Sequence, residues 1–363
     1  MTSNKKFFLS ALVFTLIFLL TVGPMTWLFA RKSLEPPWDM TNKIGGFYNE
    51  PEGEFSVLFF GSSHVYASVS PLELWYNTGV KSYVFATQLQ PMWATYYYVK
   101  EALKTQDPQL IVVECNMMGD DQEYYDDGVN FSFMDELPLS LDKLKLAMVS
   151  APAGERAPLI WNFMKYHSRW DELEDQDYHT RRSQLRDPYR GHVLLPDRQV
   201  TAPEVIPMEA GESGALLEKN VEYLEKIIAL CEAEGIDLWL IKAPSNTALE
   251  ETQALRMESV EELAAAYGVP FDDFNQCYEA IGLTTADFYD QRHLTGVAPP
   301  GSPTISASCS AAAGPVWPPT PATSSGAPTI PPTARLWRPP EPIKRRPAQE
   351  IERGGVRLNR QSR

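Results

Sequence analysis

Short apolar runs alternate with longer amphipathic runs over most of the chain, from residue 55 to residue 267. The short runs are rich in β-branched and aromatic residues, which is typical of buried strands. There are four of them: "FSVLFF" (55–60), "SYVFA" (82–86), "LIVVEC" (110–115) and "DLWLIKA" (237–243). The longer runs at 91–103, 214–234 and 249–267 carry apolar residues at helical spacing. Strands and helices in series predict an α/β fold, with a mostly parallel sheet covered on both faces.

The N-terminus carries a 24-residue stretch without a charge, Phe7–Ala30, bracketed by Lys5-Lys6 and Arg31-Lys32. About 20 apolar residues suffice to cross a bilayer as a helix. A cleavable signal peptide, the alternative, has a shorter apolar region and small residues before its cleavage site, and Leu28-Phe29-Ala30 fits that pattern poorly. We therefore predict an uncleaved single-pass anchor over residues 1–32, with the N-terminus inside and the body outside the cell.

The remaining boundaries follow from changes in composition. Residues 33–54 are polar and rich in Pro and Gly, so we predict a juxtamembrane linker. Residues 55–296 form the predicted α/β domain, which is interrupted at about 117–213 by an acidic, aromatic-rich insertion, partly helical, on one edge of the sheet. Calcium binding by its aspartates is an alternative to a solvated acidic loop, but Asp120, Asp121, Asp126 and Asp127 do not have the spacing of an EF-hand.

The C-terminal stretch 297–363 differs abruptly from the rest. It holds 14 of the 30 prolines and carries nine basic but only three acidic residues. Without strand or helix periodicity, this composition predicts disorder. A change of reading frame explains the abrupt switch, and a genuine Pro/Arg-rich, wall-associated tail is the alternative.

Charge and cysteine content exclude some classes of function. The net charge of −15 argues against nucleic acid as a partner, because phosphate binding requires an excess of Lys and Arg. The four cysteines have neither CxxC nor metal-ligand spacing, so neither a zinc site nor a disulfide framework is predicted. We expect no metal and no cofactor.

The first predicted strand runs directly into Gly61-Ser62-Ser63-His64. α/β hydrolytic enzymes expose a nucleophile in a glycine-tight turn between a strand and a helix. A serine there needs a base, usually a histidine that is held by a carboxylate. An ordinary strand-to-helix turn is the alternative for this motif taken alone.

Two further motifs favour the catalytic interpretation. Asp290 precedes His293 by three residues, so its carboxylate can reach one ring nitrogen and leave the other free to deprotonate a serine. Asn116 follows the strand at 110–115, which brings its amide to the same edge of a parallel sheet. A surface Asp–His pair and a turn-forming asparagine are the alternatives for each motif alone.

In this order, strand-Gly-x-Ser, strand-Asn and Asp-x-x-His resemble the sequence blocks of SGNH/GDSL hydrolases. "GSSH" behind an N-terminal span and "DxxHL" near the end resemble the membrane-anchored, extracytoplasmic branch that includes the D-alanyl transfer protein of teichoic acid modification and the alginate O-acetylation proteins. The resemblance covers roughly residues 55–296 and implies a three-layer αβα, flavodoxin-like fold. It implies Ser63 as nucleophile, His293 as base, Asp290 as its orienting partner and Asn116 as oxyanion donor.

The chain departs from the family pattern in two places. The family's second block usually supplies a glycine as an oxyanion donor, and here "SYVFATQLQP" leaves only the backbone of Ala86 or Thr87. Relatives also continue past Asp-x-x-His into a helix that closes the domain, whereas this chain enters the proline-rich stretch. We therefore expect a weakly braced Asp–His loop, and a product inactivated by the altered C-terminus is the alternative to an active enzyme.

The resemblance implies a serine acyltransferase or esterase that acts on O-acyl groups of a cell-envelope or exported polysaccharide, teichoic acid included. It also implies a partner, a polytopic membrane O-acyltransferase. A simple extracytoplasmic esterase and a non-catalytic scaffold for such an acyltransferase are the alternatives. The acyl group, the polymer and the oligomeric state are left open by the sequence.

One aromatic and basic motif lies inside the insertion, Tyr166–Trp170, "YHSRW". Contact with a sugar or an anionic polymer is one interpretation, and a structural cluster is the favoured one. His167, His179 and His192 have no ligand spacing.

Overall fold

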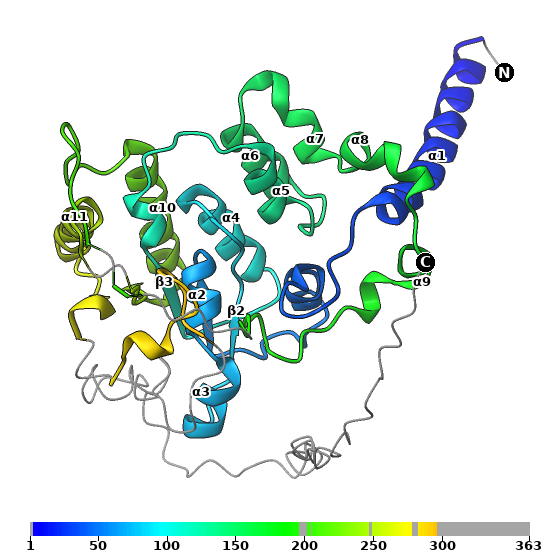
Figure 1. The fold of residues 1–363 in the computed structure, drawn as a ribbon. Coiled ribbons are helices and arrows are strands. Elements are labelled where there is room, and N and C mark those ends of the chain that lie inside the picture. The colour runs from blue at the N-terminus through cyan, green and yellow to red at the C-terminus, as the bar shows by residue number, and fades with distance from the viewer. Residues whose placement is uncertain (1–2, 196–201, 204, 247–248, 278–281, 296–363) are drawn as a thin grey trace, which may run out of the picture. The chain divides into compact units, whose positions relative to one another are not determined.

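Five parallel strands form the central sheet in a computed structural model that describes residues 3–195, 202–203, 205–246, 249–277 and 282–295 (Figure 1). Their order across the sheet is β2-β1-β3-β5-β7. The strands are β1 (Val57–Phe60), β2 (Ser82–Val84), β3 (Leu110–Glu114), β5 (Asp237–Lys242) and β7 (Phe271–Asp273). Two short strands, β4 (Val205–Ile206) and β6 (Leu249–Glu250), pair separately. The predicted α/β class with a parallel sheet is confirmed.

The strand order creates a switch point at the carboxyl ends of β1 and β3. Along the chain, the second strand lies on one side of the first strand and all later strands lie on the other. This is a doubly wound order, in which ligands bind outside the carboxyl ends at the point of reversal. The register pairs Val57 with Leu110 and Phe60 with Val113, so residues that follow β1 and β3 meet at this edge.

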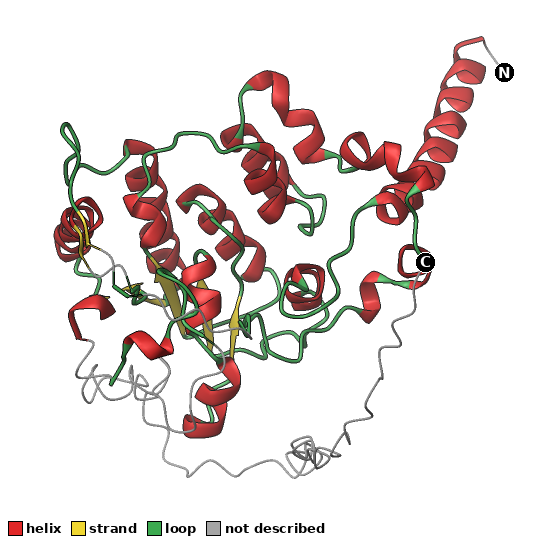
Figure 2. Ribbon diagram, viewed as in Figure 1, coloured by secondary structure: helices red, strands yellow, loops and turns green. Residues whose placement is uncertain are grey.

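Side chains alternate along the strands and feed two separate cores. Leu58, Phe60, Ile111 and Val113 belong to the core on one face, together with residues of the helices on that side. Those helices are α4 (Met92–Ala102), α10 (Glu218–Glu234) and α11 (Glu251–Tyr267). Phe59 and Val112 face the other core, where α2 (Ser63–Ser68) and α3 (Pro71–Thr78) pack with residues 283–294. Figure 2 shows the strands between these helices.

The predicted insertion at 117–213 contains a series of short helices. They are η2 (Asn116–Gly119), α5 (Asp127–Met134), α6 (Leu141–Ser150), η3 (Ala153–Glu155), α7 (Arg156–Ile160), α8 (Phe163–Tyr166), η4 (His167–Asp171), α9 (Asp175–His179) and η5 (Arg182–Gln184). Phe133 and Leu146, from α5 and α6, join the core on the α4 side. The chain then returns to the sheet, where the Val84 amide donates to the Arg190 carbonyl over 2.9 Å.

The stretch 33–54, for which composition predicts a juxtamembrane linker, is partly packed into the core. A short π-helix, η1 (Thr41–Gly45), forms in its middle, and Ile44 and Phe47 are fully buried. Lys43 is buried with them and forms ion pairs with Asp39 and Asp187 at 3.2 and 3.3 Å. The two apolar side chains anchor this stretch to the core because they lose contact with water there.

The N-terminal helix α1 (Ser3–Phe29) is long and apolar enough, by length and composition, to cross a membrane. Its first two thirds are exposed, and it becomes covered toward its C-terminal end. The predicted stretch at 297–363 lies outside the described residues.

Candidate active site

The turn after β1 is shaped by Gly61 and capped by Ser62. Gly61 has φ of 143°, and a Cβ atom there would lie 2.8 Å from Cβ of Glu114, so only glycine fits. The Ser62 side chain accepts a hydrogen bond from the amide of His64, which caps α2. Ser63 is therefore the first residue of α2, and its side chain lies at the carboxyl edge of the sheet.

The loop that carries Asp290 and His293 is closed by a short antiparallel bridge. Phe288 pairs with Leu294, and both side chains are buried in the core beside α2 and α3. The Tyr289 amide donates to the His293 carbonyl over 2.8 Å. The expectation of a weakly braced loop is thus not met in the described residues, because two buried apolar side chains hold its ends.

Ser63, His293 and Asp290 form one hydrogen-bonded chain. Nε2 of His293 lies 2.8 Å from Oγ of Ser63. Nδ1 of the same ring lies 3.0 and 2.9 Å from Oδ1 and Oδ2 of Asp290. This is the relative arrangement of nucleophile, base and orienting carboxylate in a serine triad, reached here by residues 230 positions apart.

The electrostatics of Asp290 suit an orienting carboxylate. Burial alone would raise the pKa of Asp290, but hydrogen bonds from the His293 ring and the Arg292 amide outweigh it, so the net pKa is lowered. The carboxylate is consequently ionised at neutral pH, where it can stabilise a positive charge on the imidazole.

Asn116 begins η2, directly beyond β3. Its side-chain oxygen lies 3.4 Å from Nε2 of Gln253 on α11, which also donates to its backbone carbonyl over 3.1 Å. Its Nδ2 has only the sulfur of Met117, at 3.9 Å, as an acceptor among the described residues. The amide donor of Asn116 is therefore available at the switch point.

Backbone amides add two further donors at this edge. Within the described residues, neither the Ala86 amide nor the Ser63 amide has a hydrogen-bond acceptor. The Thr87 amide, the other predicted donor, is already bound to Oε1 of Gln90 over 3.1 Å. Of the two backbone amides predicted as oxyanion donors after β2, the Ala86 amide is therefore the one without an acceptor among the described residues.

A buried carboxylate, missed by sequence reasoning, lies next to the turn that carries Ser63. Glu114 is fully buried at the end of β3. It accepts hydrogen bonds from Oγ of Ser62 over 3.1 Å and from the amide of Asn116 over 2.9 Å. One carboxylate thus connects the turn of Ser63 to the start of η2. A charged residue at the end of the apolar run "LIVVE" is the signal that could have revealed it.

The environment of Glu114 contains one compensating charge, Lys242 at the end of β5. Burial raises the pKa of Glu114, while Lys242 and the hydrogen bonds from Asn116 and Ser62 oppose that rise. Burial likewise lowers the pKa of Lys242, and Glu114 opposes that change. Asp273 and Glu250 also act on Lys242, whereas removal of Lys242 would take from the buried Glu114 the positive charge that opposes its burial.

His64 and Tyr66 line the other side of Ser63. The His64 ring lies 5.4 Å from the His293 ring, and its Nδ1 is buried without a partner among the described residues. Burial, with Lys242 nearby, lowers the pKa of His64 well below its usual range. This ring is therefore neutral at neutral pH and adds no positive charge beside His293. Burial raises the pKa of the Tyr66 phenol, and the nearby Ser63 hydroxyl opposes that rise.

The acidic residues of the insertion have structural partners instead of a metal arrangement. Asp126 caps α5 through the amide of Val129 at 3.0 Å, and Asp121 lies 3.3 Å from Arg256. Among the described residues, no group of three or more His, Cys, Asp or Glu side chains could hold a metal ion.

No protein-family model matches the chain, and no curated protein matches it significantly.

Proposed function

We propose that the protein is a membrane-anchored SGNH-type serine enzyme that transfers or hydrolyses O-acyl groups of a cell-envelope or exported polysaccharide. The observation that carries the proposal is the continuous hydrogen-bonded chain from Asp290 through His293 to Ser63, at the switch point of a doubly wound sheet. The polysaccharide substrate and a polytopic membrane O-acyltransferase as partner follow from the resemblance to SGNH hydrolases.

The chemistry follows from the positions of the side chains. Oγ of Ser63 attacks the acyl carbonyl carbon while Nε2 of His293 takes its proton. Asp290 holds the ring and stabilises its positive charge. Nδ2 of Asn116 with the free amides of Ser63 and Ala86 would stabilise the oxyanion. His293 then returns the proton to the leaving alcohol, and water or a polymer hydroxyl releases the acyl group from Ser63.

Membrane anchoring is part of the proposal and is supported by the length and composition of α1. With Lys5 and Lys6 ahead of the apolar stretch, we place the N-terminus inside the cell and the sheet with its serine on the extracytoplasmic side. A soluble enzyme with a removed leader is the alternative, and the mass of the mature N-terminus distinguishes the two.

The test is hydrolysis of a chromogenic acetyl ester by the full chain in detergent. Ser63→Ala should lower kcat by roughly a thousandfold or more, because the nucleophile is lost. Ser183→Ala, an exposed serine on η5 that has no contact with the site, is the matched control and should retain wild-type activity. Equal activity of Ser63→Ala and wild type would refute the proposal and favour a non-catalytic scaffold.

A second assay separates transfer from hydrolysis. The purified chain is given a polysaccharide with and without an acyl donor. Donor-dependent gain of acyl groups indicates a transferase, and loss of acyl groups from a pre-acylated polymer indicates a plain esterase.

A further inference from the structure

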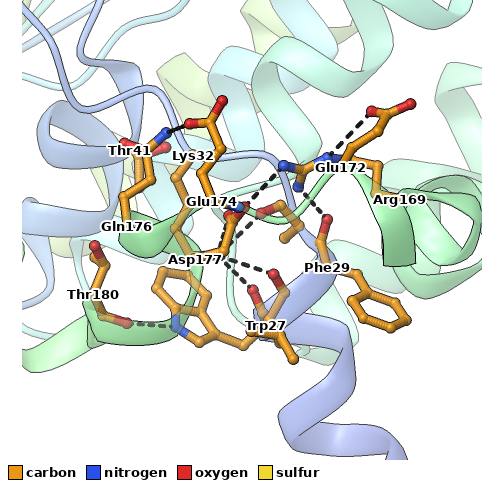
Figure 3. Close-up of polar contacts among 12 residues, drawn as sticks. Trp27, Phe29, Lys32, Thr41, Arg169, Glu172, Glu174, Gln176, Asp177 and Thr180 are labelled. Atoms are coloured by element: carbon orange, nitrogen blue, oxygen red, sulfur yellow. Dashed lines mark hydrogen bonds and ion pairs between the residues drawn. The ribbon is translucent and has the colours of Figure 1, made fainter.

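The C-terminal end of α1 is fixed to the insertion by buried polar contacts (Figure 3). Nζ of Lys32 donates to the Trp27 carbonyl over 2.8 Å and to Oδ1 of Asp177 over 3.2 Å. Arg169 bonds both the Phe29 carbonyl, at 2.5 Å, and Oδ2 of Asp177, at 3.0 Å. The side chains of Lys32 and Asp177 are almost completely buried. The junction between helix and body is therefore rigid.

Aromatic residues of the insertion also contact α1 further toward its N-terminus. Phe163 of α8 stacks on Phe29 at 5.7 Å between ring centroids. Nε1 of Trp161, in the turn between α7 and α8, donates to Oγ1 of Thr26 over 3.0 Å. The Trp161 ring also meets Phe18 edge-on at 6.4 Å. From Phe29 to Phe18 the helix axis runs about 16 Å, at about 1.5 Å per residue.

The required length of the span places these contacts inside the bilayer. Starting from Phe7, the first residue after the charged Lys5-Lys6 pair, a helix needs about 20 residues to cross the hydrocarbon core. This count reaches Thr26. The side chain of Trp161 touches α1 at Thr26 and at Phe18, and therefore lies at or within the hydrocarbon boundary.

The segment around Trp161 carries further exposed apolar side chains. Met164 is 46% exposed and Trp170 is 70% exposed. The side chain of Arg31 is 71% exposed, although it lies 3.8 Å from Glu172, whereas Lys165 is mostly covered and pairs with Asp135. Tryptophan is enriched at membrane interfaces, and Lys and Arg there pair with lipid phosphates.

We propose that residues 156–170 form a wedge that inserts into the outer boundary of the bilayer beside α1, with phospholipid as its occupant. The inference rests on the membrane anchoring in the proposed function. Continuity with the apolar surface of α1 favours lipid over a protein partner, because the half-buried ring of Trp161 packs on the span and the exposed side chains of Met164 and Trp170 lie in the same segment. The wedge and the buried junction together hold the α/β domain in one orientation to the membrane.

Tryptophan quenching tests the wedge. The full chain is reconstituted into phosphatidylcholine and phosphatidylglycerol vesicles with brominated acyl chains, which quench indoles only at close range. Trp161→Phe keeps an aromatic ring but removes the indole, and it should reduce the quenched part of the emission. Trp75→Phe, on α3, is the matched control and should leave that part unchanged. Identical quenching of wild type and Trp161→Phe would overturn the proposal.

A photoreactive residue at Met164 provides a second measurement, which does not perturb the junction. In native membranes, a lipid adduct at this position supports the wedge. A discrete protein adduct overturns it and indicates a partner surface, and a lack of any adduct overturns it as well.

Two readouts separate failure of the wedge from failure of the proposed function. Resistance to alkaline extraction reports whether α1 anchors the chain, and labelling of Ser63 by a serine-directed probe reports the triad. If the chain is anchored and Ser63 is labelled, but quenching is the same in wild type and Trp161→Phe, the wedge is refuted and the proposed function is not.

Discussion

At the scale of single residues, Glu114 links the turn after β1 to the start of η2. It is buried, and its two oxygens bond the Ser62 hydroxyl and the Asn116 amide. A displacement of about 1 Å in a reacting group can cost about a hundredfold in rate. We therefore predict that Glu114 positions the turn of Ser63 and the start of η2, and that it acts through these two contacts.

Glu114→Gln should lower kcat for a chromogenic ester by about tenfold to a hundredfold and leave KM nearly unchanged. The glutamine side chain keeps the volume of glutamate but is uncharged and has only one oxygen. It therefore cannot accept the hydrogen bonds of both Ser62 and Asn116 as the carboxylate does. Labelling of Ser63 should persist, more slowly. Glu232→Gln, exposed on α10, is the matched control. A wild-type kcat for Glu114→Gln would show that Glu114 does not position the site.

The proximity of Ser63, His293 and Asp290 could be expected from sequence because each lies in a recognisable local pattern. Ser63 follows a buried strand and a glycine, and Asp290 precedes His293 by one turn. Glu114, Tyr66 and His64 could not be assigned, because their relation to Ser63 depends on side-chain directions in the folded chain. Their catalytic or positioning roles remain predictions.

At the scale of elements, the sequence predicts four strands of the central sheet to within two residues at each end. Strand β7 was missed, since three residues of sequence "FDD" are too short and too acidic to resemble a buried strand. The packing of residues 33–54 is likewise not predicted from their composition. Their Pro and Gly content suggests a linker, but burial of Ile44 and Phe47 against distant residues outweighs this local preference.

A buried histidine, His192, links the stretch 33–54 to the edge of the sheet beside β2. His192 is buried beside β2, and its carbonyl accepts a hydrogen bond from Nζ of Lys43 over 2.9 Å. Lys43 is in turn paired with Asp39 and Asp187. Burial, with the charge of Lys43 as a second cause, lowers the pKa of His192 to about 4.

The folded body should therefore lose stability as the pH falls from 6.5 toward 4. In this window the unfolded chain binds a proton at His192 and the folded chain does not. The free energy of unfolding therefore falls by about 3 kcal/mol over the whole window. Urea unfolding in detergent at pH 7 and pH 5 measures the effect. His192→Gln should lose less stability between these values than wild type does.

His167→Gln is the control for this comparison, since His167 is exposed on η4. It should show the same pH dependence as wild type. Carboxyl groups with altered pKa values are present in all three proteins, so their contribution cancels. Equal losses for wild type and His192→Gln would contradict the assignment.

At the scale of the whole molecule, the doubly wound sheet brings together residues that are 230 positions apart. The alternation of strands and helices predicts this sheet, because carboxyl ends of parallel strands share one edge. The attachment of α1 to the insertion is different. The contacts of Lys32 with Asp177 and of Trp161 with Thr26 join segments whose local sequence gives no sign of their proximity.

The most direct test of the central claim is the position of covalent modification by a serine-directed fluorophosphonate. The full chain in detergent is labelled at neutral pH, digested and analysed by peptide mass spectrometry. We expect one modified residue, Ser63, and labelling that is lost in Ser63→Ala and strongly slowed in His293→Ala. Modification of Ser62 instead, or equal labelling of wild type and Ser63→Ala, would contradict the triad.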